Sequence, residues 1–343
     1  MRLQQIVGIM AFSLGLCITS YAQQAEVVPE LPAMRIERIA PELDELLDDD
    51  ALVQIISQGH DWIEGPVWMN DGGYLLFSEI PKNQILKWKQ GEGVSIHIEP
   101  SGYTGKAKFT GSEPGTNGLI IDNLGRVITA CHGDRMIRRI ERDGSHTILA
   151  SHYMGKRFNS PNDLVYHSSG NLYFTDPPYG LPDRFTDKGR ETEWCGVYRL
   201  APDGNVTLLS KMIDAPNGIG LSPDEKTLYV AQSSPVAANW TAFDILDDGN
   251  VSEGRILYDA TDIVAQWKGV PDGMTVDAHG NIWGSGPGGV MIISPEGKLL
   301  GRIVTGQATS NCTFGEDGTT LFITADMYLL RVETKSLGRE FVE

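Results

Sequence analysis

Short runs of alternating apolar and polar residues fill most of this chain, and turn residues separate one run from the next. Examples are ILKWKQ from Ile85 and GVYRLAP from Gly196. Alternation with a period of two places every second side chain on one face of a β-strand. Turns such as residues 70–73 and 278–281 contain glycine and asparagine, which adopt positive φ in tight hairpins. No helical pattern alternates with these strands, so the sequence predicts an all-β fold and argues against a doubly wound one.

One sequence pattern recurs six times. It consists of an acidic or amide residue, which glycine usually follows, then an apolar pair, a turn and a second β-rich run. The copies begin at Glu64, Asn117, Asn162, Asn217, Asp272 and Asn311, at intervals of 39 to 55 residues. About four strands in a period of roughly 45 residues are typical of one propeller blade. The repeat therefore predicts a six-bladed β-propeller. The strand-like segment ALVQIIS at residues 51–57 and the run from Leu329 are expected to share one blade and close the ring.

The N-terminal part of the chain lacks this repeat. Residues 1–22 combine Arg2, an apolar run from Ile6 to Ile18 and small residues before position 23, as a secretory signal peptide does. Residues 23–51 form an N-terminal extension, in which PELDELLDDDA at 41–51 has helical spacing and is expected to cap the propeller. Residues 52–343 form the propeller domain. We therefore expect an exported protein, periplasmic or secreted, with no membrane span after the signal is removed.

The net charge limits the partners that the chain can bind, and the cysteine content limits its disulfide bonding. The formal net charge of −17 repels nucleic acid and anionic lipid surfaces but favours a divalent cation. Removal of the signal leaves Cys131, Cys195 and Cys312, an odd number, so no disulfide framework is expected to hold the fold.

The first residue of each copy is the candidate for chemistry. Inner strands of a propeller surround the channel, so residues at the same repeat position form a ring around its axis. Asn and Asp before glycine are common turn formers, but Glu64 has no such role. Two carboxylates and several amide oxygens suit Ca²⁺, and Mg²⁺ or Mn²⁺ could replace it. Zn²⁺ is a possible substitute but the poorer match, because none of the seven histidines falls on the ring.

Five phrases in this order resemble the family of gluconolactonases, senescence marker protein and luciferin-regenerating enzyme. They are EGPVW at Glu64, FNSPNDLV at Phe158, YFTDPPYG at Tyr173, PNGIGLSPDEKTLYV at Pro216 and PDGMTVDAHGNIW at Pro271. The resemblance implies a calcium-dependent propeller lactonase whose metal ligands are Glu64, Asn162, Asn217 and Asp272. Some relatives have an arginine where Ser160 stands, so the lactone contacts of that arginine are not transferred to this chain.

The resulting hypothesis is hydrolysis of a cyclic ester, namely an aldonolactone such as glucono-1,5-lactone. Asp272 is the preferred general base that activates water, and Glu64 is the alternative. The candidate substrate-binding residues are Asn117, His132, Asp176 and Tyr179. The chain contains neither G-x-S-x-G nor H-E-x-x-H, which disfavours a serine esterase and a zinc peptidase. Two alternatives stay open: a phosphotriesterase or fluorophosphatase on the same metal site, and a non-catalytic, calcium-stabilised binding propeller. The sequence leaves the oligomeric state open.

Overall fold

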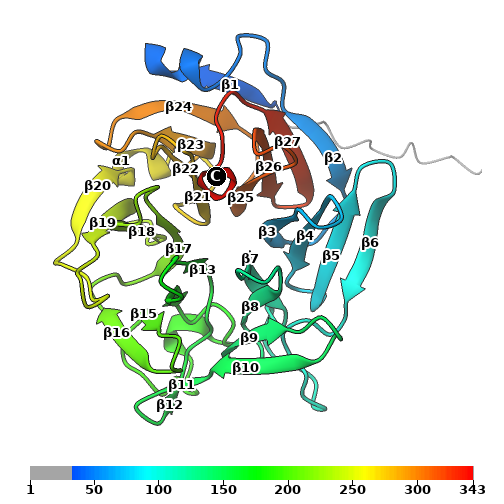
Figure 1. The fold of residues 1–343 in the computed structure, drawn as a ribbon, viewed down its shortest axis with the longest axis vertical. Coiled ribbons are helices and arrows are strands. Elements are labelled where there is room, and N and C mark those ends of the chain that lie inside the picture. Colours follow the sequence, from blue (N-terminus) through cyan, green and yellow to red (C-terminus); the bar gives the residue numbers. More distant parts are fainter. Residues whose placement is uncertain (1–32, 343) are drawn as a thin grey trace, which may run out of the picture. The chain divides into compact units, whose positions relative to one another are not determined.

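Six antiparallel sheets surround a central channel in the computed structural model, which describes residues 33–342 of the chain (Figure 1). This arrangement confirms the predicted six-bladed propeller. The proposed signal peptide, residues 1–22, lies outside the described residues. No helix within 33–342 is long and apolar enough to cross a membrane.

Each sheet is given from its innermost to its outermost strand. The first contains β3 (Ile63–Met69), β4 (Tyr74–Glu79), β5 (Gln84–Lys89) and β6 (Gly93–Ile98), and the second β7 (Thr116–Ile121), β8 (Val127–Cys131), β9 (Met136–Ile140) and β10 (His146–Ala150). The third contains β13 (Leu164–Tyr166), β14 (Leu172–Asp176), β15 (Gly196–Leu200) and β16 (Val206–Ser210), and the fourth β17 (Pro216–Leu221), β18 (Thr227–Gln232), β19 (Asn239–Asp244) and β20 (Arg255–Asp259). The fifth contains β21 (Met274–Val276), β22 (Ile282–Gly286), β23 (Gly289–Ile293), β24 (Leu299–Val304) and β1 (Arg35–Arg38), and the sixth β25 (Asn311–Gly315), β26 (Thr320–Ala325), β27 (Tyr328–Glu333) and β2 (Gln54–Gln58).

The smaller elements lie in the connections between these strands or after the last strand. They are the hairpin β11 (His152–Tyr153) and β12 (Lys156–Arg157), the short helices η1 (Pro41–Glu45), η2 (Arg184–Thr186) and α1 (Thr261–Val264), and the C-terminal η3 (Arg339–Phe341).

The ring closes as the sequence predicts, because β2 pairs antiparallel with β27 in the sixth sheet. Gln54 lies opposite Arg331 in this pairing, and Gln58 lies opposite Tyr328. A strand from before the first repeat thus completes the blade formed by the last repeat. The pairing satisfies the backbone groups of β27 that an open edge would expose.

The core consists of apolar clusters between neighbouring sheets, and each of the six interfaces within the described ring has one. Trp240 of the fourth sheet, for example, packs with Met291 of the fifth, and Tyr173 of the third sheet packs with Val230 of the fourth. Cys131, Cys195 and Cys312 are buried free thiols. Apolar packing between blades, and not disulfide bonding, therefore holds the described ring together.

The segment with helical spacing forms only a short 3-10 helix, η1. Pro41 starts it, and Leu43 and Leu47 are fully buried in the cluster between the fifth and sixth sheets. It lies at the periphery of the ring beside β24 (Figure 1). The segment thus covers the outer side of two blades and not an opening of the channel.

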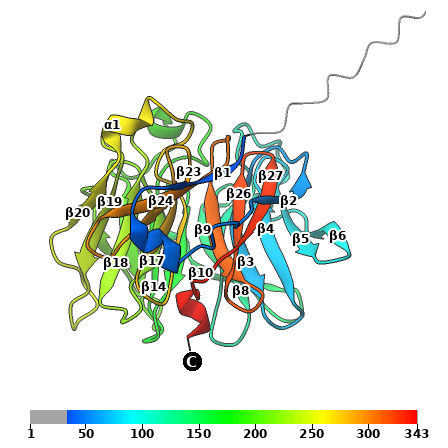
Figure 2. The same ribbon diagram turned by 90° about the horizontal axis from the view of Figure 1, so that it is seen from above.

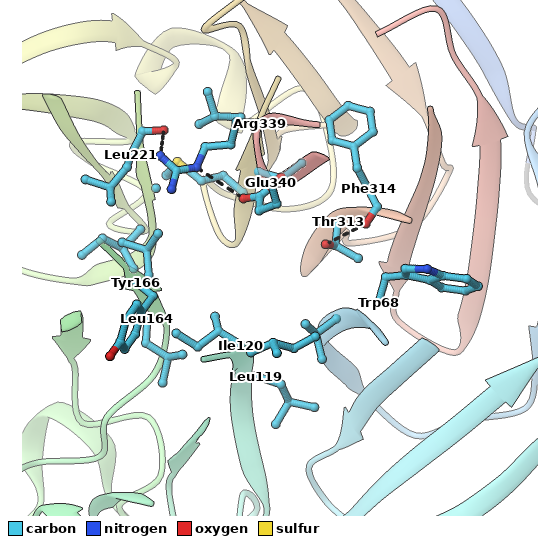
Figure 3. A pocket seen from close by; sticks show the side chains of 18 of the residues that line it. Trp68, Leu119, Ile120, Leu164, Tyr166, Leu221, Thr313, Phe314, Arg339 and Glu340 are labelled. Carbon is cyan, nitrogen blue, oxygen red and sulfur yellow. Dashed lines mark hydrogen bonds and ion pairs between the residues drawn. The ribbon is translucent and has the colours of Figure 1, made fainter. Parts of the chain in front are cut away.

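The C-terminal segment occupies one end of the channel, where η3 lies at the centre of the ring (Figures 1 and 2). Gly338 forms a bridge with Asp277, and Arg339 Nη1 donates a 2.9 Å hydrogen bond to the carbonyl of Ser222. A cavity of about 590 Å³ lies here, between η3 and apolar residues such as Leu119 and Leu164 of the inner strands (Figure 3). The ring residues predicted from the sequence lie at the other end of the channel, at or just before the starts of the inner strands.

Candidate active site

The ring residues converge because the inner strands approach one another closely where they begin. A Cβ on Gly65, which has φ +50°, would clash with the backbone carbonyl of Asn117, and one on Gly218 would clash with that of Asp272. Glycine after Glu64 and after Asn217 is thus required by the neighbouring blade's approach and not only by turn formation. This close approach brings together side chains that lie far apart in the sequence.

Five of the six ring residues line one cavity of about 470 Å³, together with the predicted substrate residue Tyr179. They are Glu64, Asn117, Asn162, Asn217 and Asp272. Asn311 is not among the lining residues; its side chain covers Gly273, and its Oδ1 accepts a 2.8 Å hydrogen bond from the Cys312 backbone. The structure therefore brings all four proposed metal ligands to one cavity, and Asn311 lies outside its lining.

The three asparagines form a chain of hydrogen bonds around the axis. Asn117 Nδ2 donates to Asn162 Oδ1 over 2.5 Å, and Asn162 Nδ2 donates to Asn217 Oδ1. His132 Nε2 lies 3.2 Å from the same Asn162 oxygen. Asn162 Oδ1 thus contacts two potential hydrogen-bond partners, and a cation bound to this oxygen would replace one of them.

The two ring carboxylates lie in an environment that disfavours their charged forms. Glu64 is 2% exposed and its Oε2 accepts a 2.9 Å hydrogen bond from Gly65, yet burial raises the pKa of Glu64 to about 8. Burial and the charge of Glu64 raise the pKa of Asp272 well above its ordinary value. Asp272 is partly accessible, but its Oδ1 is buried without a hydrogen-bond partner. Two acidic groups at one cavity, both with raised pKa, favour a positive charge at this position.

The donor set suits a hard divalent cation. Glu64 and Asp272 supply carboxylate oxygens, including the unpartnered Asp272 Oδ1, and Asn162 and Asn217 supply amide oxygens. Within residues 33–342, no three His, Cys, Asp or Glu side chains gather as a metal-binding group. A set of two carboxylates completed by amides and water matches calcium better than zinc.

His132 and Asp176 are buried, and neither lines this cavity. His132 reaches the site through Asn162, and its Nδ1 lies 3.1 Å from Glu113 Oε2. The Asp176 carboxylate instead accepts 2.8 Å hydrogen bonds from the backbone N–H groups of Asn159 and Ser160. Neither residue therefore reaches the cavity wall, and their role as substrate contacts stays a prediction.

Glu113 and Arg184 line the cavity, although the sequence reasoning did not select them. Arg184 Nη2 donates a 2.9 Å hydrogen bond to Glu113 Oε1, which joins the loop before β7 to the loop after β14. Neither residue stands at a repeated position, so periodicity carried no signal for them. The unusual length of the two loops, 99–115 and 177–195, was the only available indication.

Fold and site together define a six-bladed propeller enzyme with acidic and amide side chains at the open end of its channel. Residues 62–326 match the family region described as SMP-30/Gluconolactonase/LRE-like. The chain therefore belongs to the SMP-30/gluconolactonase/LRE-like family.

Individual relatives agree with this assignment. The chain is 38% identical to the gluconolactonase of Zymomonas mobilis over 97% of its own length and 96% of the relative. It is 26% identical to regucalcin of Xenopus laevis, covering 79% of this chain and 85% of the relative. Among solved structures, a gluconolactonase from Xanthomonas campestris has a TM-score of 0.76 and 32% identity, covering 89% of this chain and 97% of that one.

Proposed function

We propose that this protein hydrolyses a sugar lactone, with the conversion of glucono-1,5-lactone to gluconate as the reference reaction. The observation that carries the proposal is the convergence of Glu64, Asp272 and three amides at one cavity. The same chain is 38% identical, over 97% of its length, to a relative named gluconolactonase.

A divalent cation, calcium first, would be held by Glu64, Asn162, Asn217 and Asp272, and Mg²⁺, Mn²⁺ or Zn²⁺ could substitute. When bound, the cation would polarise the lactone carbonyl and stabilise the negative charge that develops on its oxygen. The unpartnered Asp272 Oδ1 and the raised pKa of both carboxyls support this assignment.

Asp272 is the proposed general base, which takes a proton from the water that attacks the carbonyl carbon. Asp272 is partly accessible from the cavity, whereas Glu64 is almost fully buried and one of its oxygens already bonds to Gly65. Asn117 and Tyr179 line the same cavity and are the proposed substrate contacts.

The test is turnover of the purified protein after chelation and after re-addition of Ca²⁺, Mg²⁺, Mn²⁺ or Zn²⁺. Acid release from glucono-1,5-lactone is measured against a protein-free blank, because this lactone also hydrolyses spontaneously. We expect chelation to abolish lactone turnover and calcium to restore it. Faster turnover of a phosphotriester would favour the phosphotriesterase alternative, and calcium-dependent stability without any turnover would favour a binding propeller.

A further inference from the structure

Two long loops meet above the candidate site. The connection from β6 to β7 spans residues 99–115 and that from β14 to β15 spans 177–195, whereas the β4–β5 and β22–β23 connections span only 80–83 and 287–288. The two loops approach so closely that a Cβ on Gly111 would lie 3.3 Å from the Pro182 backbone. The 2.9 Å hydrogen bond from Arg184 to Glu113 joins them at the cavity wall.

Ser160 holds the start of loop 177–195 in place. Ser160 Oγ donates a 2.6 Å hydrogen bond to the carbonyl of Pro177 and accepts a 2.9 Å bond from the backbone N–H of Gly180. The hydroxyl of Ser160 therefore fixes the start of the loop that carries Arg184. Phe185, the next residue, packs edge-on against the Tyr179 ring at 5.7 Å between centroids.

Arg184 supplies the positive charge that the cavity otherwise lacks. Of the described residues that line the cavity, it is the only lysine or arginine, and Glu64, Asp272 and Glu113 are acidic. Its bond to Glu113 is the one side-chain hydrogen bond that Arg184 makes within residues 33–342. Its side chain is 53% exposed. Several of its five donor N–H groups are thus free to bind a ligand.

This position is useful for a polyhydroxylated substrate. A guanidinium donates to hydroxyl oxygens and binds a carboxylate through two parallel hydrogen bonds. Hydrolysis of a lactone turns a neutral ester into a carboxylate, which a nearby guanidinium would attract. A lysine could supply the charge but not the two-point geometry.

We propose that Arg184, oriented by Glu113, is a specificity-determining residue that contacts the hydroxyl groups of the lactone and the carboxylate of the product. The inference rests on the proposed lactonase function. In this proposal the contact between Arg184 and Glu113, and not the ring residues, selects hydroxylated lactones over lactones without hydroxyl groups.

The experiment compares Arg184→Ala and Arg184→Lys with Lys188→Ala, which removes a positive charge from an exposed position of the same loop outside the cavity. The substrates are glucono-1,5-lactone and δ-valerolactone, a lactone of the same ring size without hydroxyls. For Arg184→Ala we expect KM for the hydroxylated lactone to rise roughly 10-fold to 100-fold, the loss typical of a hydrogen bond to a charged group. For Arg184→Ala, kcat/KM for δ-valerolactone should stay within about 3-fold of the wild type, because this lactone has no hydroxyl for Arg184 to bind. For Lys188→Ala, kcat/KM for both lactones should stay within the same range, because Lys188 lies outside the cavity.

Binding of gluconate, followed by calorimetry, provides a readout that does not depend on turnover. We expect gluconate affinity to fall by a similar factor in Arg184→Ala and by less in Arg184→Lys. Equal losses of kcat/KM on both lactones, or unchanged gluconate binding, would overturn the assignment of Arg184 while leaving the lactonase function intact. A wild-type protein that hydrolyses neither lactone would overturn the proposed function and this inference with it.

Discussion

Asp272→Asn is the substitution that separates the two roles proposed for this residue. Asparagine keeps an oxygen of nearly the same size at the ligand position but removes one negative charge and the proposed base. Asp272 carries a buried oxygen without a hydrogen-bond partner, and its pKa is raised by burial and by the charge of Glu64. Removing its charge therefore relieves the metal-free protein of an unfavourable buried carboxylate. We expect metal-free Asp272→Asn to be at least as stable as the metal-free wild type.

The effect on catalysis is expected to run in the opposite direction. Loss of a general base lowers the rate about 10²-fold to 10⁴-fold, which corresponds to about 2.7–5.4 kcal/mol in the activation free energy. Loss of ligand charge alone would instead weaken calcium binding, and enough calcium would compensate for it. The two effects are distinguished by their response to the metal concentration.

The assay is lactone turnover over a calcium titration that reaches saturation for every variant. We expect saturating calcium to leave the turnover defect of Asp272→Asn in place. Glu64→Gln is the matched control, because it also removes one carboxylate charge from the ring. Full activity of calcium-saturated Asp272→Asn would refute the role of Asp272 as base. An equal residual defect in Glu64→Gln would show that ligand charge, and not a base at position 272, limits the rate.

Three further predictions concern stability and processing. Burial raises the pKa of Asp176 to about 7. Between about pH 4 and pH 7 the folded chain therefore holds a proton at Asp176 that the unfolded chain releases. The free energy of unfolding consequently falls as pH rises through this range. Urea unfolding at pH 5 and pH 7.5 should therefore show a larger decrease for the wild type than for Asp176→Asn, and equal decreases would contradict this pKa. Arg339→Ala removes the hydrogen bonds to the Leu221 and Ser222 carbonyls at the far end of the channel and should cost about 1–3 kcal/mol of stability in urea unfolding, with kcat unchanged. N-terminal sequencing of the exported protein should find a chain that begins near Gln23, and recovery of the intact N-terminus from the cytoplasm would contradict the signal peptide.

Much of the fold could be predicted from the sequence because its determinants are local. Alternation of apolar and polar residues identifies a strand within a few positions, and glycine-containing turns separate the strands. Six copies of one phrase then fix the number of blades, which the six sheets confirm. The pairing of β2 with β27 could also be predicted, since a closed ring leaves no open edge.

The ring residues could be selected for the same reason, because equal repeat phase means equal distance from the axis. Phase alone, however, could not distinguish Asn311 from the other five. Its side chain covers Gly273 of the fifth blade, and this contact depends on how the fifth and sixth blades pack.

The tertiary structure alone decided which non-repeated residues complete the site. Glu113 and Arg184 meet across two long loops, His132 is buried beside Asn162, and the Asp176 carboxylate turns toward the backbone of Asn159 and Ser160. None of these contacts has a sequence period. The sequence by itself determined the propeller, its closure and the polar ring, because each follows from a pattern that repeats along the chain. The wall of the cavity depends on single contacts between loops, which exist only once the blades are packed in a ring.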